Sequence, residues 1–491
     1  MDGQFILPLI LFIGVFIQPA FQKHYSVINK NQYGVILDVG SSSTKVRIYR
    51  WFNDEANPTD VPEIHLAHNK RIKVSLEDLA HDEDELKREL MEAIDIAVEY
   101  INNTEDIVDF TQIPLYVMST AGTRTLTGYD ARHFVKNIRK ILSNSSINPF
   151  DFKANNIQIL SGEEEGVYSW LSTNYLLGFF NFTGPPVSPV GILEMGGGST
   201  QISFIPHDPL YDGEFHLYVA KRRYDLYVHS YLNFGQNYMK HRVNNWLLHH
   251  YNNKPHISDP CRLVGDDTKV KRHNKTMILH GSGNITQCQH IIQSFIEKAE
   301  GDECSPKPCA IGHVYQPHVS NITFYAFGAF KYAPISLNAL DDSKTLNITQ
   351  LQEAAELQCA KNISEISEEE KRYASEYCLM GVYLSLLLTK AYGFNETTSK
   401  IIVSDRIHGM KTDWTLGVML HEILQKQAMA TSKPVVEIHC PNLGKKVHSS
   451  ASTNAKLSWL NLSSIMILVT VNMWLLGILE DSSGCRLVSF T

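Results

Sequence analysis

Two short segments of the chain combine an acid, glycine, serine and threonine in the same order. Residues 36–48 read ILDVGSSSTKVRI and residues 192–204 read ILEMGGGSTQISF, so that Asp38 aligns with Glu194. Each reads as an apolar strand, an acid, a turn of small residues and a second, alternating strand, which predicts a hairpin. Two matches with the acid, the glycine and the Ser-Thr pair in phase indicate a duplicated unit.

The tips of these hairpins have the chemistry of a phosphate site. Glycine and serine let the backbone approach a ligand closely, successive N–H groups form an anion-binding nest, and hydroxyls add donors. A carboxylate does not bind phosphate, but it can hold a divalent cation or its waters. We therefore expect the two hairpins to clamp a polyphosphate and its cation. The alternative is a pair of ordinary tight hairpins with exposed tips.

A third segment joins a buried strand to a small-residue turn. Residues 115–118 (LYVM) read as the strand, and residues 119–124 (STAGTR) read as the turn. The small residues suit close approach to a ligand, and Arg124 could face phosphate or cap a helix. Taken alone, this pattern is more typical of a structural strand–turn–helix.

A fourth segment carries three consecutive acids. A strand at 157–160 is followed by SGEEEG at 161–166 and then by a helix with an apolar face. Ser161 and Glu164 match a capping box, and acids in a first turn are favoured by the helix dipole. Three acids exceed what capping needs, so at least one of them is a candidate general base that faces a cleft.

Charge and length exclude some classes of protein. Lys and Arg number 44 against 52 Asp and Glu, a net charge of −8, and the 491 residues are 43% hydrophobic. This composition is typical of globular proteins, and the length suggests two to four domains or lobes. Because nucleic-acid binding needs clustered Lys and Arg, we expect no nucleic-acid partner.

Apolar segments near both ends predict attachment to a membrane. Residues 5–17 are apolar but shorter than a full span, so we interpret 1–22 as a signal peptide or a signal-anchor. Residues 457–479 are long enough for a transmembrane helix, with a buried core helix as the alternative. They follow a Ser/Asn/Lys-rich linker at 446–456 and precede a polar tail at 480–491.

Cysteines and glycosylation sequons favour an oxidising compartment. All 8 cysteines lie after residue 260, and no CxxC pair resembles a zinc site. We expect the region between the apolar ends to be lumenal or extracellular, in the Golgi, other endomembranes or the plasma membrane. The sequons begin at Asn102, Asn144, Asn181, Asn274, Asn284, Asn321, Asn347, Asn362, Asn395 and Asn461.

Five motifs, in this order, resemble the apyrase-conserved regions of the membrane-bound nucleoside triphosphate diphosphohydrolases. They are YGVILDVGSSSTKVRIY, STAGTR, LSGEEEGVYSWLSTNYLLG, GILEMGGGSTQISF and FYAFGAF, and the similarity covers roughly residues 33–420. The resemblance implies an α/β, two-lobe, actin-like (RNase H-like) fold with a nucleotide cleft between the lobes. Lobe I would comprise 33–172, completed by 405–445, and lobe II would comprise 173–404.

The resemblance also implies a role for single residues. Glu165, directly before Gly166, matches the catalytic base that activates a water for attack on the terminal phosphorus. Asp38 and Glu194 match the two acids that hold Ca²⁺ or Mg²⁺ through its water shell. The other matches are the water-positioning groups Thr120, Ser199 and Gln201, the phosphate ligands Ser41, Ser42, Ser43, Gly197, Gly198, Ser199 and Arg124, and the base-stacking aromatics Tyr332 and Trp414. For each aromatic, core packing is the alternative.

The activity that the resemblance implies is metal-dependent hydrolysis of nucleoside tri- and diphosphates (the ATP, ADP, UDP and GDP class) to the monophosphate. We also expect a homo-oligomer, since paired anchors often favour association. Two alternatives are an exopolyphosphatase or a sugar kinase of the same fold, which the Glu-rich motif disfavours. A third, from another class, is a nucleotide-binding membrane receptor or adhesion protein that has lost catalysis. The retained Glu165 and Asp38 argue against it.

Among the departures of the chain from the family pattern, one concerns a predicted metal ligand and another concerns the cysteines. The family usually has Asp where this chain has Glu194, and the longer acid moves the carboxylate outward; restoring Asp is expected to be tolerated. The reduced cysteine set is similar to that of Golgi, endo-lysosomal and some invertebrate members. Within that set, order and spacing favour the pairs Cys261–Cys288, Cys304–Cys309 and Cys359–Cys378, although sequence alone does not fix connectivity.

Overall fold

The computed structural model describes residues 31–52, 61–105, 108–181, 184–272, 275–297, 303–431, 437–439 and 486–488. The expected signal-anchor, linker and transmembrane segment lie outside these residues, as do Cys440, Cys485 and most of the polar tail. No helix in the described ranges is long and apolar enough to cross a membrane. The chain divides into two units: residues 1–424 hold both large sheets, and 425–491 hold the antiparallel strands β17 (Glu437–His439) and β18 (Arg486–Val488).

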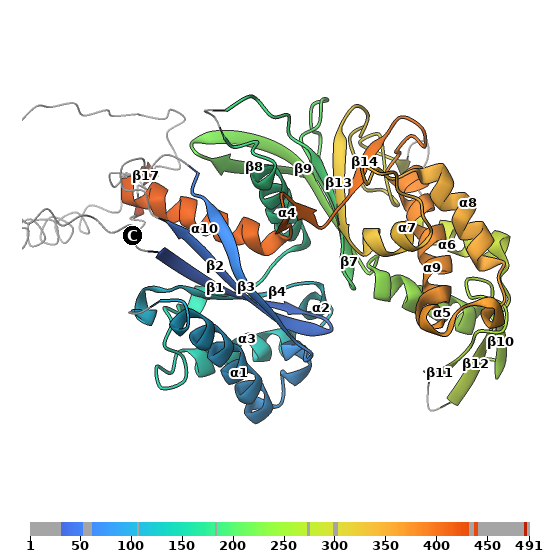
Figure 1. Ribbon diagram of the computed structural model, residues 1–491, viewed down its shortest axis with the longest axis horizontal. Helices are drawn as coiled ribbons and strands as arrows, with labels where there is room; N and C mark the ends of the chain where they lie inside the picture. Colours follow the sequence, from blue (N-terminus) through green and yellow to red (C-terminus); the bar gives the residue numbers. More distant parts are fainter. Residues whose placement is uncertain are drawn as a thin grey trace, which may run out of the picture. The chain divides into compact units, whose positions relative to one another are not determined.

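The first sheet has five strands in the order β3-β2-β1-β4-β5 (Figure 1). Strand β1 pairs antiparallel with β2 and parallel with β4, which pairs parallel with β5. The predicted hairpin at 36–48 is confirmed as the β1–β2 hairpin, and its turn is Ser41–Ser42. The strands are β1 (Asn31–Gly40), β2 (Ser43–Phe52), β3 (Ile64–Ile72), β4 (Leu115–Ser119) and β5 (Ile157–Ile159).

The second sheet repeats this arrangement. Its order is β14-β13-β6-β7-β9-β8, in which β6 and β7 form the predicted second hairpin and β13 and β14 continue in parallel. Strand β8 is one strand more than the first sheet has. The predicted duplication within an α/β fold is therefore confirmed. The strands are β6 (Gly191–Met195), β7 (Ser199–Phe204), β8 (Glu214–Val219), β9 (Arg222–Leu232), β13 (Thr323–Gly328) and β14 (Lys400–Val403).

Helices cover both faces of each sheet, because successive strand residues point to opposite faces. Val35 and Leu37 of β1 share a core with α1 (Glu83–Asn102) and α3 (Gly128–Leu142). Ile36 points the other way, into a central layer formed by α4 (Gly162–Leu176) and α10 (Trp414–Thr431). The far face of the second sheet packs against α5 (Gln236–His250), α6 (Ile285–Ile296), α8 (Ile348–Cys359) and α9 (Glu368–Leu386).

Helix α4 begins at the predicted capping box. The Ser161 hydroxyl accepts from the backbone N–H of Glu164 at 3.1 Å, and the Glu164 carboxylate accepts from that of Ser161 at 2.8 Å. The helix packs against β6, β7 and β9 of the second sheet. The predicted lobe boundaries, with the first part of lobe I ending at residue 172, remain a prediction.

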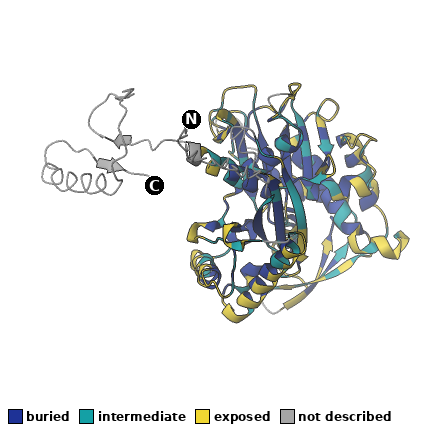
Figure 2. Ribbon diagram, turned by 60° about the vertical axis from the view of Figure 1, so that its left-hand side comes forward, coloured by how far each residue is buried: buried dark blue, intermediate teal, exposed yellow. Residues whose placement is uncertain are grey.

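The second lobe also contains a small sheet and the disulfide bonds. Strands β10 (His256–Asp259), β12 (Lys275–Gly281) and β11 (Asp267–Arg272) form the small sheet, in that order. All three expected pairs, Cys261–Cys288, Cys304–Cys309 and Cys359–Cys378, are bonded. The α-helices and strands of the described ranges not yet named are α2 (Ala121–Arg124), α7 (Tyr332–Ser336), β15 (Arg406–Ile407) and β16 (Met410–Lys411). Buried residues concentrate in the strands of both large sheets and in the helices packed on them, and the most exposed residues lie at the surface (Figure 2).

Candidate active site

Strand alternation brings Asp38 and Glu194 to facing sides of the two sheets. Asp38 lies two residues after Ile36 in β1, and Glu194 lies two residues after Ile192 in β6. Ile36 and Ile192 are both buried in the central layer, so each acid shares the face of the sheet that looks into that layer. Both acids are themselves buried. The duplicated hairpins thus present one acid each from opposite sides.

A cavity of about 400 Å³ lies between the two hairpin tips. Its walls come from eight segments of the sequence: both tips, Arg71 on β3, the turn after β4, the starts of α4 and α5, and the segments at 328–332 and 414. Most of the predicted site residues line it. They are Asp38, Ser41, Ser42, Ser43, Thr120, Glu165, Glu194, Gly197, Gly198, Ser199, Tyr332 and Trp414.

Glu165 lies in the first turn of α4, and its carboxylate accepts hydrogen bonds from two residues that do not line the cavity. Arg124 donates from Nη2 to Glu165 Oε2 at 2.6 Å, and Gln201 donates from Nε2 to the same oxygen at 3.2 Å. No donor within the described ranges reaches Oε1. Burial raises the pKa of Glu165 to about 7; Arg124 opposes the rise and Asp38 adds to it. A carboxyl of this pKa can accept a proton near neutral pH.

Two hydroxyls beside Glu165 are placed to donate hydrogen bonds into the cavity. Ser199 Oγ accepts from Arg124 Nη2 at 3.2 Å and from Gln201 Nε2 at 2.8 Å, so its own proton remains to be donated. Thr120 precedes α2, but its side chain makes no capping hydrogen bond. Arg124 and Gln201 do not line the cavity themselves. They act on it through their hydrogen bonds to Glu165 and Ser199. The role of Arg124 as a phosphate ligand remains a prediction.

The two facing acids differ in their surroundings. Burial alone would raise the pKa of Asp38, but Lys45 and Arg47 lower it below its ordinary value; Lys45 Nζ lies 2.8 Å from Asp38 Oδ2. Burial raises the pKa of Glu194 well above its ordinary value, and the charge of Glu165 adds to the rise. The carboxylates of Asp38, Glu165 and Glu194 thus line the same cavity. Such a set of oxygen donors suits a hard divalent cation, whose charge offsets their repulsion.

Basic residues beside Asp38 were missed in the sequence. Lys45 and Arg71 line the cavity and are directly opposite each other on β2 and β3. Arg47 is buried and forms an ion pair with Asp413, with 2.7 Å between Nη1 and Oδ2, which links the segment before α10 to the first sheet. The position of Lys45 could have been predicted from the sequence, because a two-residue turn at the tip places it opposite Asp38. The position of Arg71 could not be predicted in this way, since the register of β3 on β2 depends on a bulge.

The second tip is fixed by the start of α5. The backbone N–H groups of Gln236 and Asn237 donate to the carbonyls of Gly196 and Gly197, each at 3.0 Å. A Cβ at Gly235 would lie 2.6 Å from the carbonyl carbon of Gly197, so only glycine allows this approach. The N–H groups of the tip are thereby held in one conformation before any ligand arrives.

Tyr332 and Trp414 lie on the cavity wall with different exposure. The Tyr332 ring is 51% exposed, whereas Trp414 is 5% exposed and belongs to the core of the central layer. An exposed aromatic ring at the edge of a cavity is suited to stacking on a planar ligand. Trp414 packs in this core and also lines the cavity, so stacking on a base and core packing both stay open for it.

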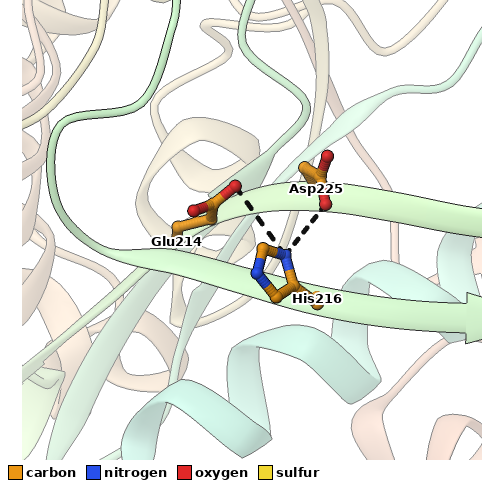
Figure 3. Close-up of side chains that lie close together, drawn as sticks. All are labelled: Glu214, His216 and Asp225. Atoms are coloured by element: carbon orange, nitrogen blue, oxygen red, sulfur yellow. Dashed lines mark hydrogen bonds and ion pairs between the residues drawn. The ribbon is translucent and has the colours of Figure 1, made fainter. Parts of the chain in front are cut away.

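A second group of potential metal ligands lies on the β8–β9 hairpin. Glu214, His216 and Asp225 present ligand atoms within 4.8 Å of one another and are exposed (Figure 3). Arg223 already donates to Asp225 Oδ1 at 2.5 Å and to His216 Nε2 at 3.4 Å. His216 Nδ1 then carries the proton that Asp225 accepts at 2.9 Å. These side chains therefore pair with one another and with Arg223 in an ion-pair cluster on the surface.

The Arg124–Glu165 contact predicts a shift in pH dependence. If Glu165 is the base that the resemblance implies, kcat/KM should rise with pH through its pKa of about 7, because a base must be deprotonated to act. Arg124 lowers that pKa, so Arg124→Gln should move the rise to higher pH. The measurement is log kcat/KM against pH for nucleotide hydrolysis, with Arg132→Gln on the exposed side of α3 as the control. An unmoved or lowered inflection in Arg124→Gln would contradict the contact's role.

Known proteins show the same sequence pattern and fold. Ectonucleoside triphosphate diphosphohydrolase 1 of Bos taurus is 29% identical over 430 residues, which cover 79% of this chain and 80% of that protein. Ectonucleoside triphosphate diphosphohydrolase 2 of Mus musculus is 26% identical over 421 residues, covering 79% and 82%.

Among solved structures, one of nucleoside triphosphate hydrolases from Neospora caninum aligns with a TM-score of 0.61 at 16% identity. It covers 82% of this chain and 94% of that chain, and the likeness concerns the fold. A family model matches residues 24–437, a stretch that includes both hairpins and every residue of the cavity wall. The chain belongs to the GDA1/CD39 (nucleoside phosphatase) family.

Proposed function

We propose that this protein is an apyrase that removes the terminal phosphate from nucleoside tri- and diphosphates and yields the monophosphate. The observation that carries the proposal is the position of Glu165. Its carboxylate lies in the cavity between two glycine- and serine-rich tips, with one oxygen held by Arg124 and Gln201 and the other open to a water. Family membership and the names of the relatives support the same class of substrate.

The base acts on a water placed beside the terminal phosphorus. Glu165 Oε1 accepts the proton of that water while Thr120 and Ser199 hydroxyls orient it. Because Arg124 and Gln201 hold Oε2, the carboxylate cannot turn away when the water binds. The water attacks in line with the leaving oxygen, and no phosphoenzyme is formed.

Phosphate oxygens are bound by the hairpin tips. The N–H groups and hydroxyls of both tips donate to them, and Lys45 and Arg71 add positive charge on the side of the first sheet. Asp38 and Glu194 are the residues that would hold a divalent cation, Ca²⁺ or Mg²⁺. When bound, the cation neutralises charge on the phosphates and on the leaving group.

The runner-up is a nucleotide-binding membrane receptor or adhesion protein without catalysis. Glu194, where the family usually has Asp, is the single feature that favours it. A phosphate-release assay with ATP, ADP, UDP, GDP and AMP separates the two functions. Release from tri- and diphosphates but not from AMP supports the apyrase. Binding of nucleotide without release, with Ca²⁺ and with Mg²⁺, would favour the receptor.

We also propose that the catalytic region is lumenal or extracellular, glycosylated, and attached to a membrane through the apolar ends, with self-association as a further expectation. Asn102, Asn144, Asn284, Asn347 and Asn395 are exposed sequon positions. Asn284 and Asn347 cap helices by accepting through Oδ1, which is compatible with a glycan on Nδ2. The three disulfides suit the same compartment.

The glycosylation proposal predicts a change in gel mobility. The chain made in a eukaryotic cell should migrate faster after digestion with an N-glycosidase, and replacement of sequon asparagines by Gln should also make the undigested chain migrate faster. Asn155, an exposed asparagine outside any sequon, provides the control as Asn155→Gln. Mobility that ignores the glycosidase would contradict the proposed compartment.

A further inference from the structure

The longer acid at position 194 has a specific partner on the helix that carries the base. Ser169 is completely buried in α4, and its hydroxyl donates to Glu194 Oε2. Glu165 and Ser169 are four residues apart, so they lie on the same face of the helix. One face of α4 therefore carries the proposed base and also holds one of the proposed cation-binding acids.

Neighbouring contacts fix both members of this pair. The carbonyl of Ser169 accepts from Thr173 Oγ1 at 2.8 Å, so the helix turn around Ser169 is tied internally. On β6, the carbonyl of Glu194 accepts from Thr200 Oγ1 at 2.8 Å, and Glu194 is directly opposite Gln201 of β7. The Glu194 side chain therefore starts from a fixed point on the sheet and reaches a fixed hydroxyl on the helix.

We infer that Ser169 is a positioning residue for Glu194, and that the two form one unit which sets the cation-binding geometry of this chain. With the glutamate, one carboxylate oxygen is held by Ser169 and the other remains for the waters of the cation. An aspartate at position 194 is shorter by a methylene group and withdraws from Ser169 toward β6, which leaves a buried hydroxyl without its acceptor. We therefore expect Glu194→Asp to weaken cation binding in this chain, in contrast to the tolerance that the family pattern implies.

The inference deepens the proposed function, because it rests on Glu194 as a cation-binding acid. It predicts that the effects of changes at 169 and 194 are not additive, as is found for groups in direct contact. In the chain with Glu194, Ser169→Ala should weaken divalent-cation binding about tenfold, the size of a lost hydrogen bond to a charged group. In the Glu194→Asp chain, the same Ser169→Ala change should alter binding by less than about twofold, since the pair is already broken.

The test measures cation affinity without turnover. The full-length chain and its variants are titrated with Mn²⁺ in the presence of a non-hydrolysable triphosphate analogue, and free Mn²⁺ is followed by electron paramagnetic resonance. Ser172→Ala is the matched control, since Ser172 is an equally buried serine of α4 whose hydroxyl bonds Thr412 at 3.2 Å instead of an acid. Ser172→Ala should leave Mn²⁺ affinity unchanged, and thermal unfolding reports whether each variant is folded.

A further variant separates failure of the inference from failure of the proposed function. If Glu194→Gln leaves Mn²⁺ affinity unchanged, Glu194 does not hold the cation, and the proposed function of this acid and the inference fall together. If Glu194→Gln weakens Mn²⁺ binding but Ser169→Ala and Ser172→Ala have the same Mn²⁺ affinity, the proposed function stands and the inference is overturned. Equal effects of Ser169→Ala in the chain with Glu194 and in the Glu194→Asp chain would also overturn it.

Discussion

Glu165→Gln should reduce kcat for nucleotide hydrolysis by about 10²–10⁴-fold, the usual cost of removing a general base. Glutamine keeps the shape of the side chain and can still meet Arg124 or Gln201, but it cannot take a proton from water. Substrate binding should survive, because the phosphate donors belong to the hairpin tips and not to α4. The measurement is kcat from phosphate release, together with the dissociation constant of a non-hydrolysable nucleotide.

The neighbouring acid provides a matched control. Glu164 is in the same helix turn, but its carboxylate accepts from the Ser161 backbone N–H and takes no part in the cavity wall. Glu164→Gln should therefore lower the free energy of unfolding by about 1 kcal/mol, as a changed helix cap does. Its kcat should stay close to that of the unchanged chain. If Glu165→Gln kept near-full turnover while Glu164→Gln abolished it, the base would be Glu164.

Removal of divalent cations should lower the rate of hydrolysis at least about 100-fold, since a cation at transferring phosphates contributes several kcal/mol. The physical reason is the charge of the cavity. Asp38, Glu165 and Glu194 face the space that a polyphosphate must enter, and only Lys45 and Arg71 add positive charge to the wall. Phosphate release is measured in excess chelator and again after Ca²⁺ or Mg²⁺ is added back.

The control for this experiment is a test that the chain stays folded without the cation. Thermal unfolding in chelator should show a folded chain, because the described core is held by buried side chains and three disulfides. Recovery of activity on adding the cation then assigns the loss to the site. Full turnover by a folded chain in excess chelator would contradict the roles of Asp38 and Glu194.

Much of the fold and the cavity could be predicted because both depend on local patterns. The hairpins around Asp38 and Glu194 have their acid, tip and alternating strand in one short segment each, and the duplication implied that the two would face each other. The capping box at Ser161 and Glu164 is equally local, since its two hydrogen bonds join residues three apart. These predictions needed no knowledge of long-range packing.

The parts that escaped prediction depend on how distant segments pack. Ser169 reads as one more small residue in an apolar helix until α4 is placed against β6. The contact of Arg124 with Glu165 likewise appears only when the turn after β4 is placed against the start of α4. The partners of a long side chain are set by tertiary structure, which the spacing of residues in the sequence does not contain.

The central claim is that a water activated by Glu165 attacks the terminal phosphorus of the nucleotide. Hydrolysis of ATP and of ADP in H₂¹⁸O tests it most directly, with products analysed by mass spectrometry. We predict that each released inorganic phosphate carries one solvent ¹⁸O atom, and that the nucleotide left by each cleavage carries none at the phosphate it retains. Release of pyrophosphate, or ¹⁸O on the retained nucleotide phosphate, would place the attack at an inner phosphorus and contradict the account.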